Sequence, residues 1–241
     1  GATVTPEALA RTGAMDILVR MPVMTLTSIA QQFKYYFAWK ITEGAANLAG
    51  FGYAPSSQEE CDWEGVRQVS VVKFITADNV QTVTKLWNQR TQSWLEVYIY
   101  RRADRRWQEL LTYLVSAVWH GFYGGYYLFF LTVPLISSLD KRLRKFIRPR
   151  LYTPESLAKR GAELVPQEGK GAVALVYTLV AKITTCWTIN YYASGFLALS
   201  GTGAFALWRS YYFLGHIGAV AVHITLSLLS MAGFGPKAKT A

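Results

Sequence analysis

The chain has 241 residues, of which 51% are hydrophobic and 15% aromatic; this is too apolar and too aromatic for an ordinary soluble domain and is typical of a polytopic membrane protein. Its formal net charge is +10, but its aromatic residues lie in apolar runs and are not interleaved with Lys and Arg, which argues against nucleic-acid binding. The two cysteines, Cys61 in a polar stretch and Cys186 in an apolar one, indicate neither a disulfide framework nor a zinc site, and we expect no metal.

The N-terminal part of the chain predicts a helix that packs against other helices. The residues before it form a polar strip without a signal-peptide pattern, as expected for a piece of a longer protein. Residues 21–53 are apolar and aromatic but include charged side chains, so they are poorly suited to face lipid. Two of these, Lys40 and Glu43, lie about one turn apart and suit either an ion pair or a substrate contact.

The next part of the chain is expected to lie at the membrane surface. Residues 56–78 form a polar loop. Residues 80–100 mix polar and apolar side chains at helical spacing, which predicts an amphipathic interfacial helix with Asn88 near the edge of its apolar face. That face contains Val83, Trp87, Trp94, Leu95 and Tyr98.

The central apolar run contains the most informative residue. Residues 110–139 include no Asp, Glu, Lys or Arg, and His120 lies among them; an ionisable group is expensive at membrane depth, so a functional role is the default hypothesis. A continuous helix over residues 107–139 would overshoot a hydrocarbon core of about 30 Å. Gly121, Gly124 and Gly125 are the natural breakers, and we expect one helix to end at His120 and a second to cover residues 126–139.

Two basic clusters flank this run. If both lie on the cytosolic side, the chain enters and returns at the same membrane face as a broken or re-entrant hairpin, with His120 near the turn. The clusters are Arg101, Arg102, Arg105 and Arg106, and Lys141, Arg142, Arg144, Lys145, Arg148 and Arg150.

The C-terminal third predicts a loop and two membrane spans. Residues 152–170 are polar and suit a surface loop with one short helix, whereas residues 172–200 and 204–232 are long enough to cross a bilayer and are joined by a tight glycine turn. Two crossings return the C-terminus to the side of the second basic cluster. There Lys237 and Lys239 have the spacing of a dilysine retrieval signal for the endoplasmic reticulum.

Five blocks of this sequence together have a recognisable pattern. The most specific are SAVWHGFYGGYY at 116–127 and WNQRTQSWL at 87–95. The others are KYYFAWKITE at 34–43, TADNV at 76–80 and SYYFLGH at 210–216. In this order the blocks resemble the lysophospholipid acyltransferase branch of the membrane-bound O-acyltransferase family, and the resemblance spans nearly the whole chain. One departure is Gly124, where the family pattern leads us to expect Pro.

The resemblance implies an all-α fold: a polytopic transmembrane helical bundle with re-entrant or broken helices around an intramembrane site. Residues 1–241 would form the C-terminal part of a single transmembrane catalytic domain whose N-terminal helices are missing. The protein would then be a multi-pass protein of the endoplasmic reticulum membrane.

The resemblance also implies two catalytic residues, His120 and Asn88. Each has a plainer interpretation: His120 as a histidine satisfied by a neighbouring helix, and Asn88 as a solvated or helix-capping residue. Six further residues are candidates for substrate binding, although the tyrosines equally suit an interfacial aromatic belt. They are Glu43, Trp87, Trp119, Tyr123, Tyr126 and Tyr127.

The expected reaction is acyl transfer from acyl-coenzyme A to the free hydroxyl of a lysophospholipid, with acyl-coenzyme A as co-substrate and no other cofactor. Such a transfer needs a base for the hydroxyl proton, a donor for the developing oxyanion and exclusion of water. A neutral imidazole suits the first need. The Asn88 amide suits either polarisation of the thioester carbonyl or positioning of the acceptor hydroxyl, and the sequence does not decide between them. The basic residues of 141–150 suit the phosphates of coenzyme A, or plain membrane anchoring.

Two alternatives remain open from the residues alone. The acceptor is a sterol, diacylglycerol or protein hydroxyl in the first. In the second, the chain is a polytopic transporter that uses His120 at a broken helix as a proton relay. The lipid bilayer is a partner in every case, no nucleic-acid partner is expected, and the sequence does not indicate an oligomeric state.

Overall fold

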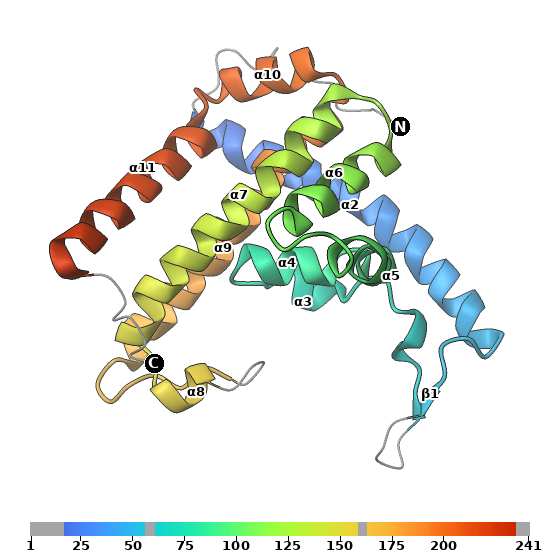
Figure 1. The fold of residues 1–241 in the computed structure, drawn as a ribbon, viewed down its shortest axis with the longest axis horizontal. Helices are drawn as coiled ribbons and strands as arrows, with labels where there is room; N and C mark the ends of the chain where they lie inside the picture. The colour runs from blue at the N-terminus through green and yellow to red at the C-terminus, as the bar shows by residue number, and fades with distance from the viewer. Residues whose placement is uncertain (1–16, 56–60, 159–162, 235–241) are drawn as a thin grey trace.

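The computed structural model describes residues 17–55, 61–158 and 163–234, and there the chain is almost entirely helical (Figure 1). The longest helices are α2 (Ile17–Leu48), α7 (Gly124–Ile147), α9 (Gly171–Leu197) and α11 (Leu214–Leu229). The shorter ones are α3 (Val71–Ile75), α4 (Val80–Leu86), α5 (Gln89–Leu95), α6 (Gln108–His120), α8 (Pro154–Ala158) and α10 (Gly201–Ser210). The only strands in the described part are β1 (Ala54–Pro55) and β2 (Cys61–Asp62), an antiparallel pair of two residues each. The all-α prediction is therefore confirmed.

Helices α7 and α9 run side by side and antiparallel through the middle of the molecule (Figure 1). At one end the backbone N–H of Gly125 donates to the carbonyl of Leu199 (2.6 Å). At the other end Arg148 Nε donates to the hydroxyl of Tyr177 (3.5 Å). Helix α6 forms a hairpin with α7, and α2 packs across α9. The α7 arm of the hairpin therefore contacts α9 from one end to the other.

Two clusters of buried side chains form the core. The first joins α2, α9 and α10, and its buried members are Met24, Tyr191, Tyr192, Ala204, Leu207, Trp208 and Tyr211. The second joins α2 to α3 and α4, and its buried members are Tyr36, Val69, Phe74, Ala77 and Val83. Because α2 contributes to both clusters, it connects the central helix pair to the short helices that carry Asn88.

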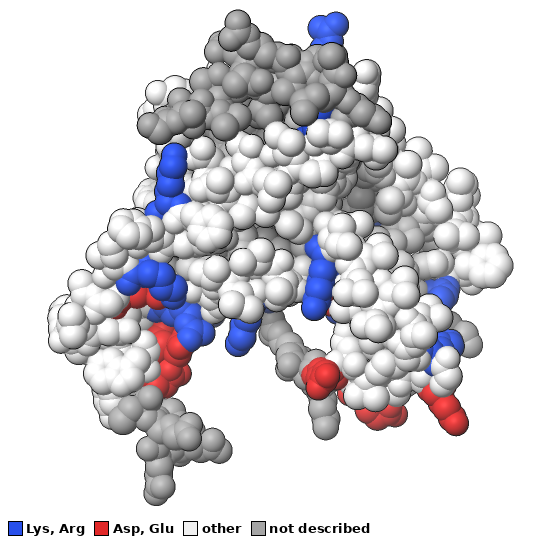
Figure 2. All heavy atoms as spheres, turned by 180° about the vertical axis from the view of Figure 1, so that it is seen from behind, with Lys and Arg blue, Asp and Glu red and all other residues white. Residues whose placement is uncertain are grey.

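Two helices of the described part are long and apolar enough to cross a membrane, as judged by length and composition: α9 and the continuous segment Leu214–Phe234. The second consists of α11 and the π-helical turn η4 (Ser230–Phe234). Most of each helix is not buried inside the molecule, as expected for segments that face lipid. Figure 2 likewise shows a largely uncharged surface, on which the visible acidic side chains lie toward the lower edge.

The predicted break in the central run is confirmed. Helix α6 ends at His120, Gly121 has a positive φ of 124°, and α7 begins at Gly124. A β-carbon is rarely tolerated at that backbone angle, so glycine ends the helix there without strain. Helix α7 contains Pro134 and continues to Ile147, beyond the predicted end at residue 139; in this added part Arg144 pairs with Asp140 one turn earlier.

The predicted amphipathic helix over residues 80–100 is wrong as a single element. It is divided into α4, α5 and the π-helical turn η2 (Glu96–Tyr100), and the chain bends at Trp87 and Asn88. The preceding loop also contains more structure than predicted: the 3₁₀ turn η1 (Glu64–Val66) and α3. In both places tertiary packing of Trp87 and Phe74 outweighs the local pattern.

The predicted span over residues 204–232 is also wrong as one helix. Residues 201–203 begin α10 and are not the turn; the chain turns two positions before them, at Leu199, which has a φ of 60°. A second bend separates α10 from α11, where Tyr212 and Phe213 have positive φ angles of 53° and 52°. The short helix α8 within residues 152–170 is confirmed, and Lys237 and Lys239 lie outside the described residues.

The basic cluster at the end of α7 is only partly available to ligands. Arg144 forms an ion pair with Asp140 (3.0 Å), and Arg148 forms one with Asp78 (2.9 Å). Asp78 belongs to the TADNV block, whose Asn79 caps α4 by accepting the N–H of Thr82 (2.8 Å). This block therefore fastens α4 to the end of α7.

Breaking the Arg148–Asp78 pair is expected to destabilise the protein. The two side chains are only 15% and 26% exposed, so Asp78→Asn leaves a largely buried guanidinium without its counter-ion. We expect the free energy of unfolding to fall by about 1–3 kcal/mol, measured by denaturant unfolding in detergent micelles. The matched control is Glu96→Gln, whose pair with Arg101 is exposed and is expected to contribute about 0–1 kcal/mol. Equal losses for the two variants would contradict the assignment of the Arg148 pair as structural.

Candidate active site

His120 lies at the C-terminal end of α6, in an aromatic enclosure. Its ring is 5.0 Å from that of Phe130 in a stacked arrangement, and 5.2 Å from that of Phe196 and 5.9 Å from that of Tyr126, both edge-on. The side chain is partly buried, and no hydrogen bond joins its ring nitrogens to another described residue. The neighbouring helix α9 therefore contacts the His120 ring through Phe196 but gives it no hydrogen bond, and the catalytic role of the imidazole stays a prediction.

Close backbone packing holds the hairpin turn next to His120. Gly125 is buried against α9, and a β-carbon there would lie 2.4 Å from the carbonyl oxygen of Gly195. At Gly124, the departure from the family pattern, a β-carbon would lie 3.0 Å from the backbone nitrogen of Gly201. The two glycines let the start of α7 approach α9 and α10 closely, which places His120 against Phe196.

Asn88 occupies the bend between α4 and α5 in a left-handed conformation, with φ 47° and ψ 54°. This conformation costs most residues about 1–2 kcal/mol, and asparagine adopts it more readily than most. The side chain does not cap α5 and makes no hydrogen bond within the described chain. Asn88 is thus the N-cap residue of α5 by position but not through its side chain, and the partly exposed amide is equally compatible with a solvated residue. Its catalytic role stays a prediction.

Trp87, the neighbour of Asn88, is packed among aromatic rings. The nearest is Trp39 at 4.8 Å between centroids, followed by Phe74 at 5.1 Å. Tyr35 and Tyr36 complete the set at 5.7 and 5.8 Å. These contacts anchor the bend; substrate binding by Trp87 stays a prediction.

Two tyrosines belong to the surroundings of Asn88 and of His120. Tyr35 packs on Trp87, the neighbour of Asn88, at 5.7 Å between ring centroids. Tyr126 in turn stacks on Phe196 at 4.3 Å and contacts the His120 ring. No hydrogen bond or ring contact among the described residues joins Tyr35 to Tyr126, so the contacts give each of the two catalytic candidates, His120 and Asn88, its own aromatic surroundings. Tyr35 was not singled out from the sequence.

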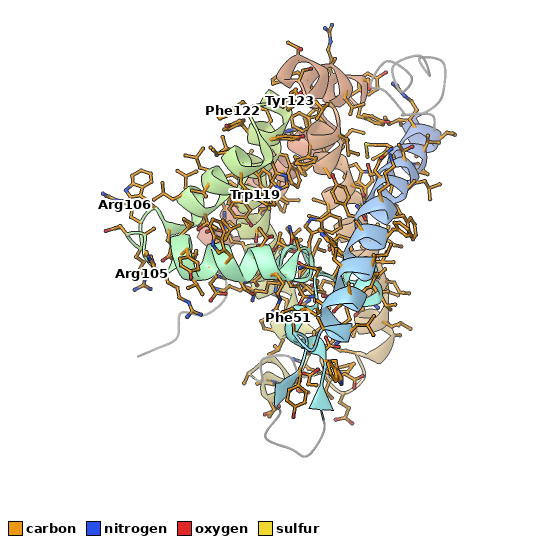
Figure 3. All side chains as sticks on the ribbon, turned by 90° about the vertical axis from the view of Figure 1, so that its right-hand side faces the viewer. Phe51, Arg105, Arg106, Trp119, Phe122 and Tyr123 are labelled. Atoms are coloured by element: carbon orange, nitrogen blue, oxygen red, sulfur yellow. The ribbon has the colours of Figure 1, made fainter. Side chains whose placement is uncertain are left out.

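Three other predicted substrate contacts lie on or near the turn. Tyr123 and Trp119 are 56% and 59% exposed, and Tyr123 lies beside Phe122 at the α6–α7 turn (Figure 3). Trp119 contacts the His120 ring at 5.0 Å, and Tyr123 contacts Tyr126 at 5.7 Å. Tyr127 is partly buried in the first turns of α7. These positions suit either a chamber wall or a membrane-facing aromatic belt.

Glu43 is engaged by the protein itself. One carboxylate oxygen pairs with Lys40, and the other accepts the backbone N–H of Gln68 (2.6 Å) and of Val69 (3.4 Å). Partial burial would raise the pKa of this carboxyl, but Lys40 and the two N–H donors outweigh it and lower the pKa below its usual range. Glu43 is therefore an anion held by the fold, and the ion-pair interpretation of its spacing from Lys40 is confirmed.

Two aromatic residues of the enclosure, Phe130 and Phe196, were missed in the sequence. Phe130 lies on α7, 10 positions after His120, and Phe196 lies on α9, 76 positions after His120. No short motif signals either one, because their contact with His120 depends on the packing of α7 against α9. The other histidines have separate partners: His216 contacts the hydroxyl of Tyr191 (3.1 Å), and His223 contacts Arg142 (2.9 Å).

Comparison with known proteins places these features in a family. The profile of the membrane-bound O-acyltransferase family matches residues 3–156, which include both His120 and Asn88. The chain is 30% identical to the lysophospholipid acyltransferase of Schizosaccharomyces pombe, over 83% of this chain and 39% of the relative. It is also 30% identical to the lysophospholipid acyltransferase of Saccharomyces cerevisiae, over 84% of this chain and 32% of the relative. It is 30% identical to membrane-bound glycerophospholipid O-acyltransferase 2 of Gallus gallus, over 87% and 38% respectively. The chain spans less than two fifths of the length of these relatives.

Proposed function

This chain belongs to the membrane-bound O-acyltransferase family, and on that premise we propose that it transfers a fatty acyl group from acyl-coenzyme A to the free hydroxyl of a lysophospholipid. The observation that carries the proposal is the His120 imidazole, which has no protein hydrogen bond in the described chain and lies within an aromatic enclosure. The names of the relatives support the lysophospholipid as acceptor over a sterol, diacylglycerol or protein.

His120 is the proposed general base. It takes the proton of the acceptor hydroxyl while that oxygen forms a bond to the thioester carbonyl carbon. The C–S bond of the tetrahedral intermediate then breaks, and the leaving thiolate takes the proton back from the imidazolium as coenzyme A. Phe130 and Phe196 limit the access of water, which would otherwise hydrolyse the thioester.

Asn88 is the proposed neutral donor. Its side-chain amide has no partner in the described chain and is available either to the carbonyl oxygen of the thioester or to the acceptor hydroxyl. Tyr35, which packs on Trp87 beside Asn88, and Tyr126, which contacts the His120 ring, are proposed to line the substrate chamber. A covalent acyl-enzyme is not part of the proposal.

The phosphates of coenzyme A are proposed to meet the basic end of α7. Arg144 and Arg148 are committed to carboxylates, whereas Lys141 and Lys145 are exposed, lie one turn apart and have no ion pair or hydrogen bond among the described residues. These two lysines are therefore the better candidates. We further propose that the protein is a multi-pass protein of the endoplasmic reticulum membrane, which its family and its two long apolar helices support.

The function is tested with the full-length protein in microsomes supplied with radiolabelled acyl-coenzyme A and a panel of acceptors. We expect labelled phospholipid that depends on an added lysophospholipid, with release of coenzyme A in equal amount. Microsomes from cells lacking the protein are the control for background activity. Product with only a sterol or diacylglycerol would change the acceptor class, and no consumption of acyl-coenzyme A would contradict acyl transfer altogether.

A further inference from the structure

The segment of residues 64–69, here called the strap, lies between α2 and the bend that carries Asn88. On its α2 side, Gln68 N–H and Val69 N–H donate to Glu43 Oε1 at 2.6 and 3.4 Å, and Lys40 Nζ donates to the carbonyl of Val69 at 3.2 Å. The side chain of Val69 is fully buried in the core cluster that contains Tyr36 and Phe74. The strap is thus fastened to α2 by charge, hydrogen bonds and packing.

On its other side the strap holds the residues that follow Asn88. The carbonyl of Gln68 accepts the backbone N–H of Gln89 at 2.8 Å. The guanidinium of Arg90 donates to the carbonyl of Gly65 at 2.7 Å and to that of Arg67 at 3.3 Å. One residue of the strap, Gln68, therefore links the Glu43 carboxylate to the residue directly after Asn88.

These contacts bear on the bend itself. Asn88 has a left-handed backbone without a side-chain cap, so neighbouring groups must maintain its conformation. Packing of Trp87 among aromatic rings holds the preceding residue, and the strap holds the two that follow. With both flanks fixed, the Trp87 cluster and the strap together hold the backbone of Asn88, and with it the point from which its side chain extends.

We propose that Glu43 is a positioning residue: it acts on acyl transfer through the strap, by holding Asn88 in place, and does not contact substrate. This inference rests on the proposed function of Asn88. Glu43 suits the role because its side chain is only 11% exposed and both of its oxygens are bound by protein groups. A positioning role requires an acceptor for Gln68 N–H, whereas a role in proton transfer requires the carboxylate itself.

The test is a double-mutant cycle in the full-length protein, read as kcat and KM for acyl-coenzyme A in microsomes. Glu43→Ala is expected to lower kcat by about 10- to 100-fold with KM changed less than about twofold, because removing a supporting contact misplaces the catalytic group. In the Asn88→Ala background, Glu43→Ala is expected to cause no further loss. Glu43→Gln, which keeps the acceptor oxygen for Gln68, is expected to recover most of the activity.

Two controls keep the result interpretable. Thr42→Ala changes an exposed neighbour that bonds only to carbonyls of its own helix, and it is expected to leave kcat unchanged. Arg90→Ala releases the strap from its other side, so it should reproduce the kcat loss even if Glu43→Ala fails to accumulate.

The proposal would be overturned if the losses of kcat from Glu43→Ala and Asn88→Ala multiplied in the double variant. It would also be overturned if Glu43→Gln were as inactive as Glu43→Ala. If Asn88→Ala kept full activity, Asn88 would have no role in acyl transfer. That result would contradict the proposed function of Asn88 itself, and not only the proposed role of Glu43 and the strap.

Discussion

Replacing His120 by alanine is expected to lower kcat for acyl transfer by a factor of about 10² to 10⁴, the range for loss of a general base. The ring is held by contacts with Phe130, Phe196 and Tyr126, and no other histidine lies among its ring contacts. The measurement is labelled phospholipid formed per molecule of variant, with the amount in the membrane quantified by immunoblot. His120→Gln, which keeps polar atoms but is not basic, should be about as inactive.

His223→Ala is the matched control for this experiment. His223 is exposed on α11 and contacts Arg142, away from the aromatic enclosure. If His120 is the histidine on which turnover depends, His223→Ala should leave the rate of acyl transfer within about twofold of the parent. A His120→Ala protein that is present in the membrane at normal levels and retains parental kcat would show that His120 is structural.

Gly125→Ala is expected to have the second largest effect, on both folding and activity. The added β-carbon would lie 2.4 Å from the carbonyl oxygen of Gly195 and 2.6 Å from that of Leu199, and both are backbone atoms that cannot rotate away. The start of α7 must then move off α9, which weakens the Gly125–Leu199 hydrogen bond and displaces His120 from Phe196. Overpacking of this kind costs about 1–3 kcal/mol, and we expect a lower melting temperature in detergent together with reduced acyl transfer.

A matched glycine is available as control. Gly171 begins α9 as Gly124 begins α7, but a β-carbon there would have no neighbour within 4 Å. Gly171→Ala should therefore melt at or slightly above the temperature of the parent, since alanine favours the helix. If Gly125→Ala also melted like the parent, the close approach of α7 to α9 at this point would be incorrect.

Some features of the site were predictable because their causes are local in the sequence. The absence of charge over residues 110–139 indicates a membrane-embedded run, and Gly121 just after His120 indicates a break. The order of the blocks around Trp119 and Trp87 was sufficient to indicate the family, which the profile match then confirmed. Each of these signals depends on neighbours within one or two helical turns.

The wrong predictions have a common cause. Residues 80–100 and 204–232 each have helical periodicity, yet both are bent, at Asn88 and at Tyr212 and Phe213. The bends follow from packing: Trp87 must enter an aromatic cluster with Trp39 and Phe74, which lie on other elements. A periodic pattern predicts which face of a helix is apolar. It does not predict where the elements that pack against this face lie, and their positions decide where the helix bends.

The sequence by itself therefore determined the class of protein, the helical content, the break at His120 and the two catalytic candidates, because composition, glycine positions and motif order express these within short windows. Only the tertiary structure decided that Phe196 encloses His120 and that Glu43 holds the strap. It likewise decided that Asp78 neutralises Arg148 in a basic cluster that appears free in the sequence. These contacts join residues 25 to 76 positions apart, and their free energy is gained only once α2, α7 and α9 have packed together.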